Sequence, residues 1–509
     1  MLGILILCVL AGLLAAGLTP MVRRLAVFAG ALDLPSARKV HARETPRTGG
    51  LAIAIAWLLT MGVAAVWKTF DPALSFAPGE HARLMLGAVP MLLVGLADDL
   101  YGLRARWKLA LEIAIALLMV ALGMRIDLVS LPFVGSVKTG VFGIPLTVFW
   151  LVAVVNAINL IDGLDGLASG IALIAAAANG VIALRLGRPE IALLLFVMGG
   201  ALLGFLRHNL HPATIFLGDS GSLFLGFFLA MLSLQSCQKG PTAIAIVLPM
   251  LTMALPLADT VAAFLRRTLR PGAGAWWMRL ARAFHPDRQH VHHRLLRLGF
   301  GHAETVTLLH LVCLLFAAIS VAVASVPEIG ARFILLYAAV VTAAVARKLG
   351  LFGRRATAED GGGAPELAGK RALLLGEAPG PLQLTLHEGG VRTERAADPD
   401  EGLRRYRDER HDLVVAGAGQ AADPTALRRL FGVNPDCVLL WAAPGTPPAG
   451  LPVYEWLDAG ADPARCGMAV RRGLERSALL GRVRYAFRLL WLTLTVLPIL
   501  LTLSWALGR

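Results

Sequence analysis

Residues Phe142–Gly170, FGIPLTVFWLVAVVNAINLIDGLDGLASG, decide the fold class of this chain. They begin with an apolar run, and about 20 such residues are needed for one helix to cross a bilayer. From Asn156 to Asp165 every third residue is Asn or Asp, so on a helix these side chains share one flank. Gly163 and Gly166 let the backbone unwind beside them. The stretch predicts a membrane helix that ends in a polar site, with an ordinary Asn/Asp-Gly turn as the alternative.

Long apolar runs recur along most of the chain. Of its 509 residues, 57% are hydrophobic and 16% are charged. This apolar fraction is larger than the core of a soluble protein needs. We expect an all-α polytopic membrane part, because every backbone polar group inside a bilayer needs an internal partner. Bilayer thickness predicts about eleven transmembrane helices before residue 350. They lie near residues 2–22, 49–67, 84–97, 107–124, 142–161, 167–186, 191–206, 222–238, 242–265, 305–326 and 329–346.

Basic residues predict which side of the membrane each loop faces. The formal net charge is +14, but Lys and Arg cluster beside the ends of apolar segments, which favours membrane lipids over nucleic acid as partners. With the N-terminus outside, the basic loops around residues 38–47, 104–108, 266–297 and 347–355 face the cytoplasm. The first segment lacks the basic start and cleavage site of a signal peptide, so we expect it to stay as a helix.

After Gly361–Gly363 the composition changes to that of a soluble protein. Apolar runs predict strands at 371–376, 411–417 and 436–441, and residues 401–410 form a helix between the first two. This part resembles a receiver or Rossmann-like module, but it has neither a partner acid for a dinucleotide nor a phospho-acceptor Asp. We therefore expect regulation or docking of an unknown protein partner.

The predicted domain organisation has four parts. They are a membrane-embedded domain over 1–350, a linker over 351–366, a cytoplasmic α/β domain over 367–475 and a terminal transmembrane helix within 482–509.

Two adjacent carboxylates, Asp98 and Asp99, close the third apolar segment. Paired acids at a membrane-buried helix end repel each other unless a cation or hydrogen-bond donors compensate them. The alternative is a solvated loop start that Arg104 and Arg106 balance.

A third acidic motif, Gly218-Asp219-Ser-Gly-Ser222, precedes another apolar segment. Asp219 there can coordinate Mg²⁺, while the serines and the free N–H groups of a helix start face anionic oxygens. A plain helix cap is the alternative, and it is compatible with metal binding.

The long inner loop carries Arg288, His290, His292 and His293. Several histidines raise the option of zinc, but neither cysteine nor regular ligand spacing accompanies them. Arg and His donors beside acidic clusters indicate a phosphate clamp. Carboxylates for Mg²⁺, donors for phosphate and a membrane-level position together predict phosphoryl transfer to or from a lipid.

At these motifs the chain resembles the polyprenyl-phosphate N-acetylhexosamine-1-phosphate transferases (glycosyltransferase family 4). The resemblance covers about residues 1–350. It rests on Arg38-Lys-Val-His41 with Pro46-Arg-Thr-Gly-Gly50, the Asp98-Asp99 pair, the Asn-Asp-Gly repeat, Gly218-Asp219 and the His-x-His-His loop. The last loop lacks the three adjacent histidines of the phospho-N-acetylmuramoyl-pentapeptide translocases, so the chain is more similar to the branch that uses UDP-N-acetylglucosamine.

The resemblance implies a bacterial inner-membrane enzyme with its site facing the cytoplasm. It would transfer N-acetylhexosamine 1-phosphate from a UDP-sugar to undecaprenyl phosphate with Mg²⁺, or alternatively Mn²⁺. The reaction would release UMP and start O-antigen or another envelope polysaccharide. Direct attack on the β-phosphate is expected rather than an aspartyl-phosphate intermediate, and a homodimer is left open.

The resemblance also implies roles for individual residues. Asp98, Asp99 and Asp219 would act as catalytic or metal-binding residues, and His290 would act in catalysis. The substrate-binding set would be Lys39, His41, Asn156, Asn159, Asp162, Asp165, Arg288, His292 and His293. Asp259 looks like a further family position, although an ordinary ion pair with Arg266 explains it equally well.

Two other functions compete with this one. A transporter for an anionic substrate also combines many helices with intramembrane acids, but such binding sites lie near the midplane, whereas the acids here gather at one interface. A membrane-anchored interaction protein built around the C-terminal domain would leave the polar clusters without a purpose.

Overall fold

A computed structural model describes most of the chain. It covers residues 2–33, 44–67, 78–131, 135–237, 247–268, 290–297, 300–326, 328–348, 370–396, 399–408 and 411–417, with shorter pieces between 427 and 485. The chain divides into two compact units: the helical unit spans Met1–Ala338, and the α/β unit lies within Ala339–Thr493.

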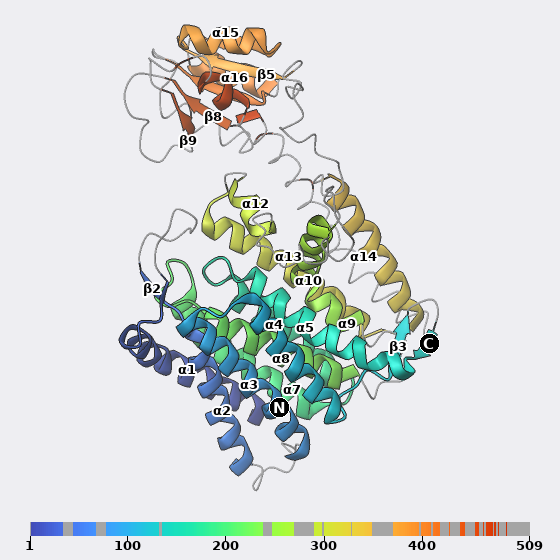
Figure 1. Ribbon diagram of the computed structural model, residues 1–509. Helices are drawn as coiled ribbons and strands as arrows, with labels where there is room; N and C mark the ends of the chain where they lie inside the picture. The colour runs from blue at the N-terminus through green and yellow to red at the C-terminus, as the bar shows by residue number, and fades with distance from the viewer. Residues whose placement is uncertain are drawn as a thin grey trace. The chain divides into compact units, whose positions relative to one another are not determined.

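The helical unit is a bundle of long apolar helices with a few short ones, and its boundary with the α/β unit falls within the last of them (Figure 1). They are α1 (Leu2–Phe28), α2 (Gly49–Trp67), α3 (Pro78–Tyr101), α4 (Ala105–Ala121), α5 (Gly143–Ile161), α6 (Leu167–Arg185), α7 (Pro189–Asn209), α8 (Gly218–Cys237), α9 (Val247–Thr252), α10 (Ala254–Thr268), α12 (Val291–Arg297), α13 (His302–Val323) and α14 (Glu328–Lys348). Two antiparallel pairs of short strands join them, β1 (Leu32–Asp33) with β2 (Thr45–Pro46) and β3 (Leu128–Leu131) with β4 (Gly135–Lys138).

The described helices make this a multi-pass membrane protein. Among the described residues, seven helices are long and apolar enough to cross a membrane. The apolar segments predicted before residue 350 correspond to helix wherever the structure describes them, but the number of eleven spans stays a prediction.

One predicted segment, 242–265, is interrupted. It contains α9 and α10, with Met253 between them, so the prediction of a single helix was wrong. Pro256 has no N–H to donate to the carbonyl of Thr252, and its ring crowds that carbonyl. The Thr252 hydroxyl donates to the carbonyl of Pro249 at 2.9 Å, which gives the break a local partner.

Helix α8 lies at the centre of the bundle and packs against α2, α3, α5 and α6. Glycines allow its close contacts, because small residues let helix backbones approach. A Cβ at Gly95 of α3 would lie 2.3 Å from the carbonyl oxygen of Asp219, and one at Gly226 would lie 2.7 Å from Cα of Val155 in α5. The end of α3 is thereby held against the start of α8, and α5 against the middle of α8.

The α/β unit contains a five-stranded parallel sheet in the order β6-β5-β7-β8-β9. The strands are β5 (Arg371–Leu375), β6 (Arg392–Ala396), β7 (Leu413–Ala416), β8 (Val438–Trp441) and β9 (Val453–Trp456), with α15 (Gly380–Glu388) and α16 (Pro399–Asp408) between the first three. The three predicted strands are β5, β7 and β8, which are central and apolar. The edge strands β6 and β9 were missed because edge strands do not need continuous apolar runs.

The predicted linker and most of the predicted terminal helix lie outside the described residues.

Candidate active site

Asp98 ends helix α3 with both carboxylate oxygens engaged. Oδ1 accepts a hydrogen bond from the backbone N–H of Leu103 at 2.7 Å, which closes the turn between α3 and α4. Oδ2 accepts from Lys108 Nζ at 2.8 Å. The turn requires a left-handed residue, Gly102, at φ 66°, and it brings the first turn of α4 back over the end of α3.

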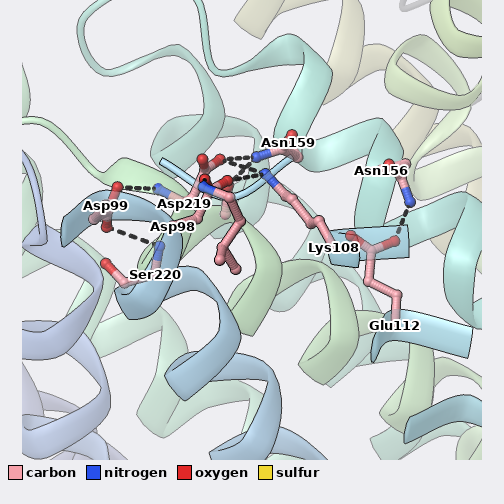
Figure 2. Close-up of polar contacts among 10 residues, drawn as sticks. Asp98, Asp99, Lys108, Glu112, Asn156, Asn159, Asp219 and Ser220 are labelled. Atoms are coloured by element: carbon pink, nitrogen blue, oxygen red, sulfur yellow. Dashed lines mark hydrogen bonds and ion pairs between the residues drawn. The ribbon is translucent and has the colours of Figure 1, made fainter. Parts of the chain in front are cut away.

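Lys108 links the first acidic motif to the third. Its Nζ lies 3.0 Å from Oδ1 of Asp219, so one ammonium group bridges Asp98 and Asp219 (Figure 2). Asn159 from α5 donates to the same Asp219 oxygen and also to Ser222 Oγ at 2.8 Å. We call Asp98, Lys108, Asn159 and Asp219 the Asp219 group, since α3, α4, α5 and α8 each contribute one side chain to it.

Asp99 holds the beginning of α8. Its Oδ1 accepts from the backbone N–H of Asp219 at 2.9 Å, and its Oδ2 accepts from that of Ser220 at 3.0 Å. Only 1% of Asp99 is exposed. A buried carboxylate at a helix N-terminus is stabilised by these free donors and by the helix dipole. Asp99, which comes from another helix, therefore caps α8.

The segment Pro46–Gly50 contacts the residues that precede α8, Phe216 and Leu217. The backbone N–H groups of Gly49 and Gly50 donate to the carbonyls of Phe216 and Leu217 at 3.0 and 2.9 Å. Between them and Pro46, Thr48 has a φ of 120°, a conformation that is unfavourable for a β-branched residue. Such backbone strain gathers at functional sites, where surrounding contacts enforce it.

Asp162 and Asp165 lie in the turn between α5 and α6. Burial, followed by the negative charges of Asp219, Asp99 and Asp165, raises the pKa of Asp162 well above its usual value. Among the described residues, no hydrogen bond or ion pair involves the Asp162 carboxylate. Acids that lie this close together without a matching positive charge are compatible with a bound cation.

Asp165 is surrounded by two histidines that the sequence did not single out. Its Oδ2 lies 2.7 Å from His211 Nδ1, and its backbone N–H donates to His302 Nε2 at 3.0 Å. The three side chains lie close enough to share a metal ion. However, the two imidazole rings stack at 4.2 Å with planes only 20° apart, and a metal ion cannot lie in the planes of two stacked rings. We interpret this cluster as a hydrogen-bonded tie between loops.

Helix α12 and the residue before it contribute the histidines of the predicted phosphate clamp. His290 Nδ1 lies 2.8 Å from Asp259 Oδ2, and Oδ1 of the same carboxylate accepts from the N–H of Val291 at 3.0 Å. Asp259 thus contacts His290 of the predicted clamp, which places it beside the other predicted site residues. A Cβ at Gly163 would lie 2.3 Å from His292 Nε2, so α12 rests on the turn that holds Asp162.

Burial followed by the neighbouring His293 and His290 lowers the pKa of His292 to about 3, which keeps this imidazole neutral at physiological pH. His292 can then donate or accept a hydrogen bond, but it adds no positive charge to a clamp. The stacked His290 and His292 rings lie 6.0 Å apart.

Two further polar side chains, Glu112 and Asn156, lie beside the Asp219 group. Glu112 on α4 is 1% exposed, and its Oε2 accepts a hydrogen bond from Asn156 Nδ2 on α5. Neither the bridging role of Lys108 nor the presence of Glu112 at the site was predicted from the sequence. Both residues are ionisable and lie within the apolar segment 107–124, and this pattern in the sequence could have predicted them as site residues.

Lys39, His41 and Arg288 lie outside the described residues. The other predicted site residues lie at the ends of α3 and α5, at the start of α8 and around α12. They are Asp98, Asp99, Asn156, Asn159, Asp162, Asp165, Asp219, His290, His292 and His293.

Sequence comparison relates this arrangement to known proteins. Residues 81–237, which contain the whole Asp219 group, match a family model described as glycosyl transferase family 4.

Three relatives extend the match. A probable undecaprenyl-phosphate N-acetylglucosaminyl 1-phosphate transferase of Bacillus subtilis is 38% identical over 304 residues, 59% of this chain and 79% of that protein. A decaprenyl-phosphate N-acetylglucosaminephosphotransferase of Mycobacterium tuberculosis is 37% identical over 57% of this chain and 75% of its own length. The undecaprenyl-phosphate alpha-N-acetylglucosaminyl 1-phosphate transferase of Escherichia coli is 31% identical over 59% and 78%.

Proposed function

Because this chain belongs to the polyprenyl-phosphate N-acetylhexosamine-1-phosphate transferases of glycosyl transferase family 4, we propose that it uses UDP-N-acetylglucosamine and undecaprenyl phosphate as substrates. The products would be undecaprenyl diphosphate N-acetylglucosamine and UMP. This lipid-linked sugar would start O-antigen or another envelope polysaccharide in a bacterial inner membrane.

The observation that carries the proposal is the Lys108 bridge between Asp98 and Asp219. It joins acids 121 residues apart in the sequence (219 − 98) into one group at helix ends, at 2.8 and 3.0 Å. Such a group suits a diphosphate that meets a lipid phosphate at the membrane surface. A transporter is not favoured, because its substrate would be expected near the midplane.

The donor set of this group fits a hard divalent cation. Asp219 and Asp98 supply carboxylate oxygens, which Mg²⁺ prefers, and Asp162 adds an unpaired carboxylate nearby. We propose Asp219 as the principal ligand for Mg²⁺, with Mn²⁺ as an alternative. When bound, the ion would neutralise negative charge on the diphosphate. Asp99 remains a predicted metal ligand, but its contacts with the N–H groups of Asp219 and Ser220 support a positioning role.

The reaction needs no strong general base. A phosphate monoester has its second pKa near 6, so most of the lipid phosphate is doubly ionised at neutral pH. An oxygen of the lipid phosphate would attack the β-phosphorus and form a new phosphorus–oxygen bond. The bond from the β-phosphorus to the oxygen that bridges it to the α-phosphorus would break, and UMP would leave with that electron pair.

The remaining predicted residues would bind the two substrates. Asn156, Asn159, Asp162 and Asp165 would line the nucleotide side, since α5 and its following turn present them together. Arg288, His290, His292 and His293 would grip the diphosphate, and Lys39 and His41 would contact a substrate phosphate. The predicted topology places all of these groups on the cytoplasmic side.

A substrate panel tests the proposal directly. Purified protein in detergent is given UDP-N-acetylglucosamine, UDP-N-acetylgalactosamine or UDP-glucose, with and without undecaprenyl phosphate and Mg²⁺, and UMP is measured. We expect UMP release only with the lipid phosphate, a divalent cation and an N-acetylhexosamine donor. UMP release that does not depend on undecaprenyl phosphate would contradict the proposal.

A further inference from the structure

Glu112 is a buried acid beside the Asp219 group, and the proposed function gives it no role. It lies one turn after Lys108 on α4, and its carboxyl group faces Asn156 of α5 (Figure 2). Lys108 Nζ is already committed to Asp98 and Asp219 at 2.8 and 3.0 Å. Within the described part of the chain, no ion pair joins Lys108 to Glu112, so neutralising Lys108 does not explain this acid.

The contacts of Asn156 fix the orientation of its amide group. Its Nδ2 donates to Glu112 Oε2 and, at 2.9 Å, to the carbonyl of Val152. Both partners are acceptors, so the NH₂ group must face them, and its two hydrogens are used. The amide oxygen of Asn156 therefore points away from both partners and stays available to accept a hydrogen bond.

Two sets of contacts connect α4 with α5, and we call the set that includes Asp219 the upper layer. In this layer, Lys108 and Asn159 both contact Asp219. In the lower layer, Glu112 meets Asn156, which precedes Asn159 by three residues and therefore lies on the same flank of α5. The lower pair thus fixes the rotation of the polar flank of α5 directly beneath the Asp219 group.

We propose that Glu112 is a positioning residue for sugar-phosphate transfer, which acts by holding Asn156 with its amide oxygen toward the substrate. This inference rests on the proposed function. The other oxygen of Glu112, Oε1, is buried without a partner among the described residues. A buried carboxylate with one donor is energetically poor, so stability alone does not account for an acid here. The contact with Asn156 instead depends on Glu112 as a hydrogen-bond acceptor.

Three substitutions separate the acceptor role from charge and from packing. Glu112→Gln keeps an oxygen that can accept from Asn156 and removes the charge. Glu112→Met keeps the approximate volume and removes the acceptor. Asn156→Ala removes the group that is being positioned. The matched control is Asn179→Ala, which deletes another buried interhelical hydrogen bond, from Asn179 Nδ2 to Thr252 Oγ1 at 3.0 Å.

The measurement is kcat/KM for UDP-N-acetylglucosamine at saturating undecaprenyl phosphate, per mole of protein that elutes as a single folded species. We expect Glu112→Met and Asn156→Ala each to lose about tenfold or more, because a buried hydrogen-bond partner is left unpaired or lost. The double variant should be no worse than Asn156→Ala, since Glu112 acts through Asn156. Glu112→Gln should stay within about threefold of the unmodified protein, and so should Asn179→Ala.

Two results would overturn the inference. If Glu112→Gln is as impaired as Glu112→Met, the charge of Glu112 is what matters. If the losses of Glu112→Met and Asn156→Ala multiply in the double variant, the two residues act independently. A failure of the proposed function is distinguishable from both, because the unmodified protein would then release no UMP in the same assay.

Discussion

The Asp219 group of the helical unit and the polar cluster around His411 in the α/β unit are both partly buried, but they balance charge differently. In the latter, Glu394 Oε1 lies 2.8 Å from Arg371 Nη2, and Glu394 Oε2 lies 3.3 Å from His411 Nε2. One acid thus meets two potential cations, Arg371 at the start of β5 and His411 just before β7. We call Arg371, Glu394 and His411 the His411 group.

In the Asp219 group, one lysine meets two acids, and two further acids, Asp99 and Asp162, lie close by. A group with excess negative charge is incomplete without a cation, whereas a balanced network can serve stability alone. Net charge within a partly buried polar cluster, rather than burial, therefore separates a candidate site from a structural network.

The largest expected effect is at Asp219. Asp219→Asn should reduce transfer by about a hundredfold or more, because the amide keeps an oxygen for Lys108 and Asn159 but removes the charge that a cation needs. Thermal unfolding should change little. UMP release and melting temperature are measured together, with Asp127→Asn, whose side chain is 79% exposed, as the control. Full activity would remove Asp219 from the metal role.

Asp99→Asn should impair both folding and activity. Asparagine has one acceptor oxygen, so its NH₂ group would oppose one of the two α8 N–H donors, and the favourable charge at the helix start would be lost. We expect about 1–3 kcal/mol lower stability and about tenfold or greater loss of transfer. The same assays used for Asp219 apply. A variant with low activity and unchanged stability would indicate that Asp99 contacts substrate or metal.

The His411 group should respond to pH without affecting transfer. Burial is the largest cause that lowers the pKa of His411, so the unfolded α/β unit binds a proton more readily than the folded one. Stability of this unit should therefore fall as the pH drops below about 6.5, the usual histidine value.

Hydrogen–deuterium exchange of β5 and β7 peptides in the full chain, corrected for intrinsic rates, measures this stability at pH 7.5 and 5.5. We expect about threefold or more loss of protection at the lower pH, and a smaller loss in His411→Gln. Equal pH dependence in both proteins would assign the effect to other groups.

The smallest expected effect is that of removing the α/β unit. A chain that stops near Arg355 should retain transfer within about twofold, because every group proposed to bind substrate or metal lies before residue 300 and the two units are separately compact. The full and truncated proteins are compared at equal amounts of protein in the membrane, and transfer to undecaprenyl phosphate is measured for both. A truncated protein that is folded yet inactive would show that the α/β unit completes the site.

The helices and the residue types of the site were already evident from the sequence. Apolar length is a local property, so the described parts of the predicted segments before residue 350 are helical, apart from the interruption at Met253. The period of three from Asn156 to Asp165 put Asn156 and Asn159 on the flank that faces Glu112 and Asp219. In the same way, the apolar central strands of the α/β unit were predicted, whereas its edge strands β6 and β9 were not.

Which polar groups meet depends on how the helices pack in three dimensions. The sequence placed Asp98 and Asp99 together, yet one binds Lys108 and the other caps α8, because adjacent residues on a helix point in different directions. Lys108, Glu112, His211 and His302 joined the polar groups through contacts between distant segments. These contacts depend on the rotation of packed helices and on close approaches at Gly95 and Gly226, which no local pattern encodes.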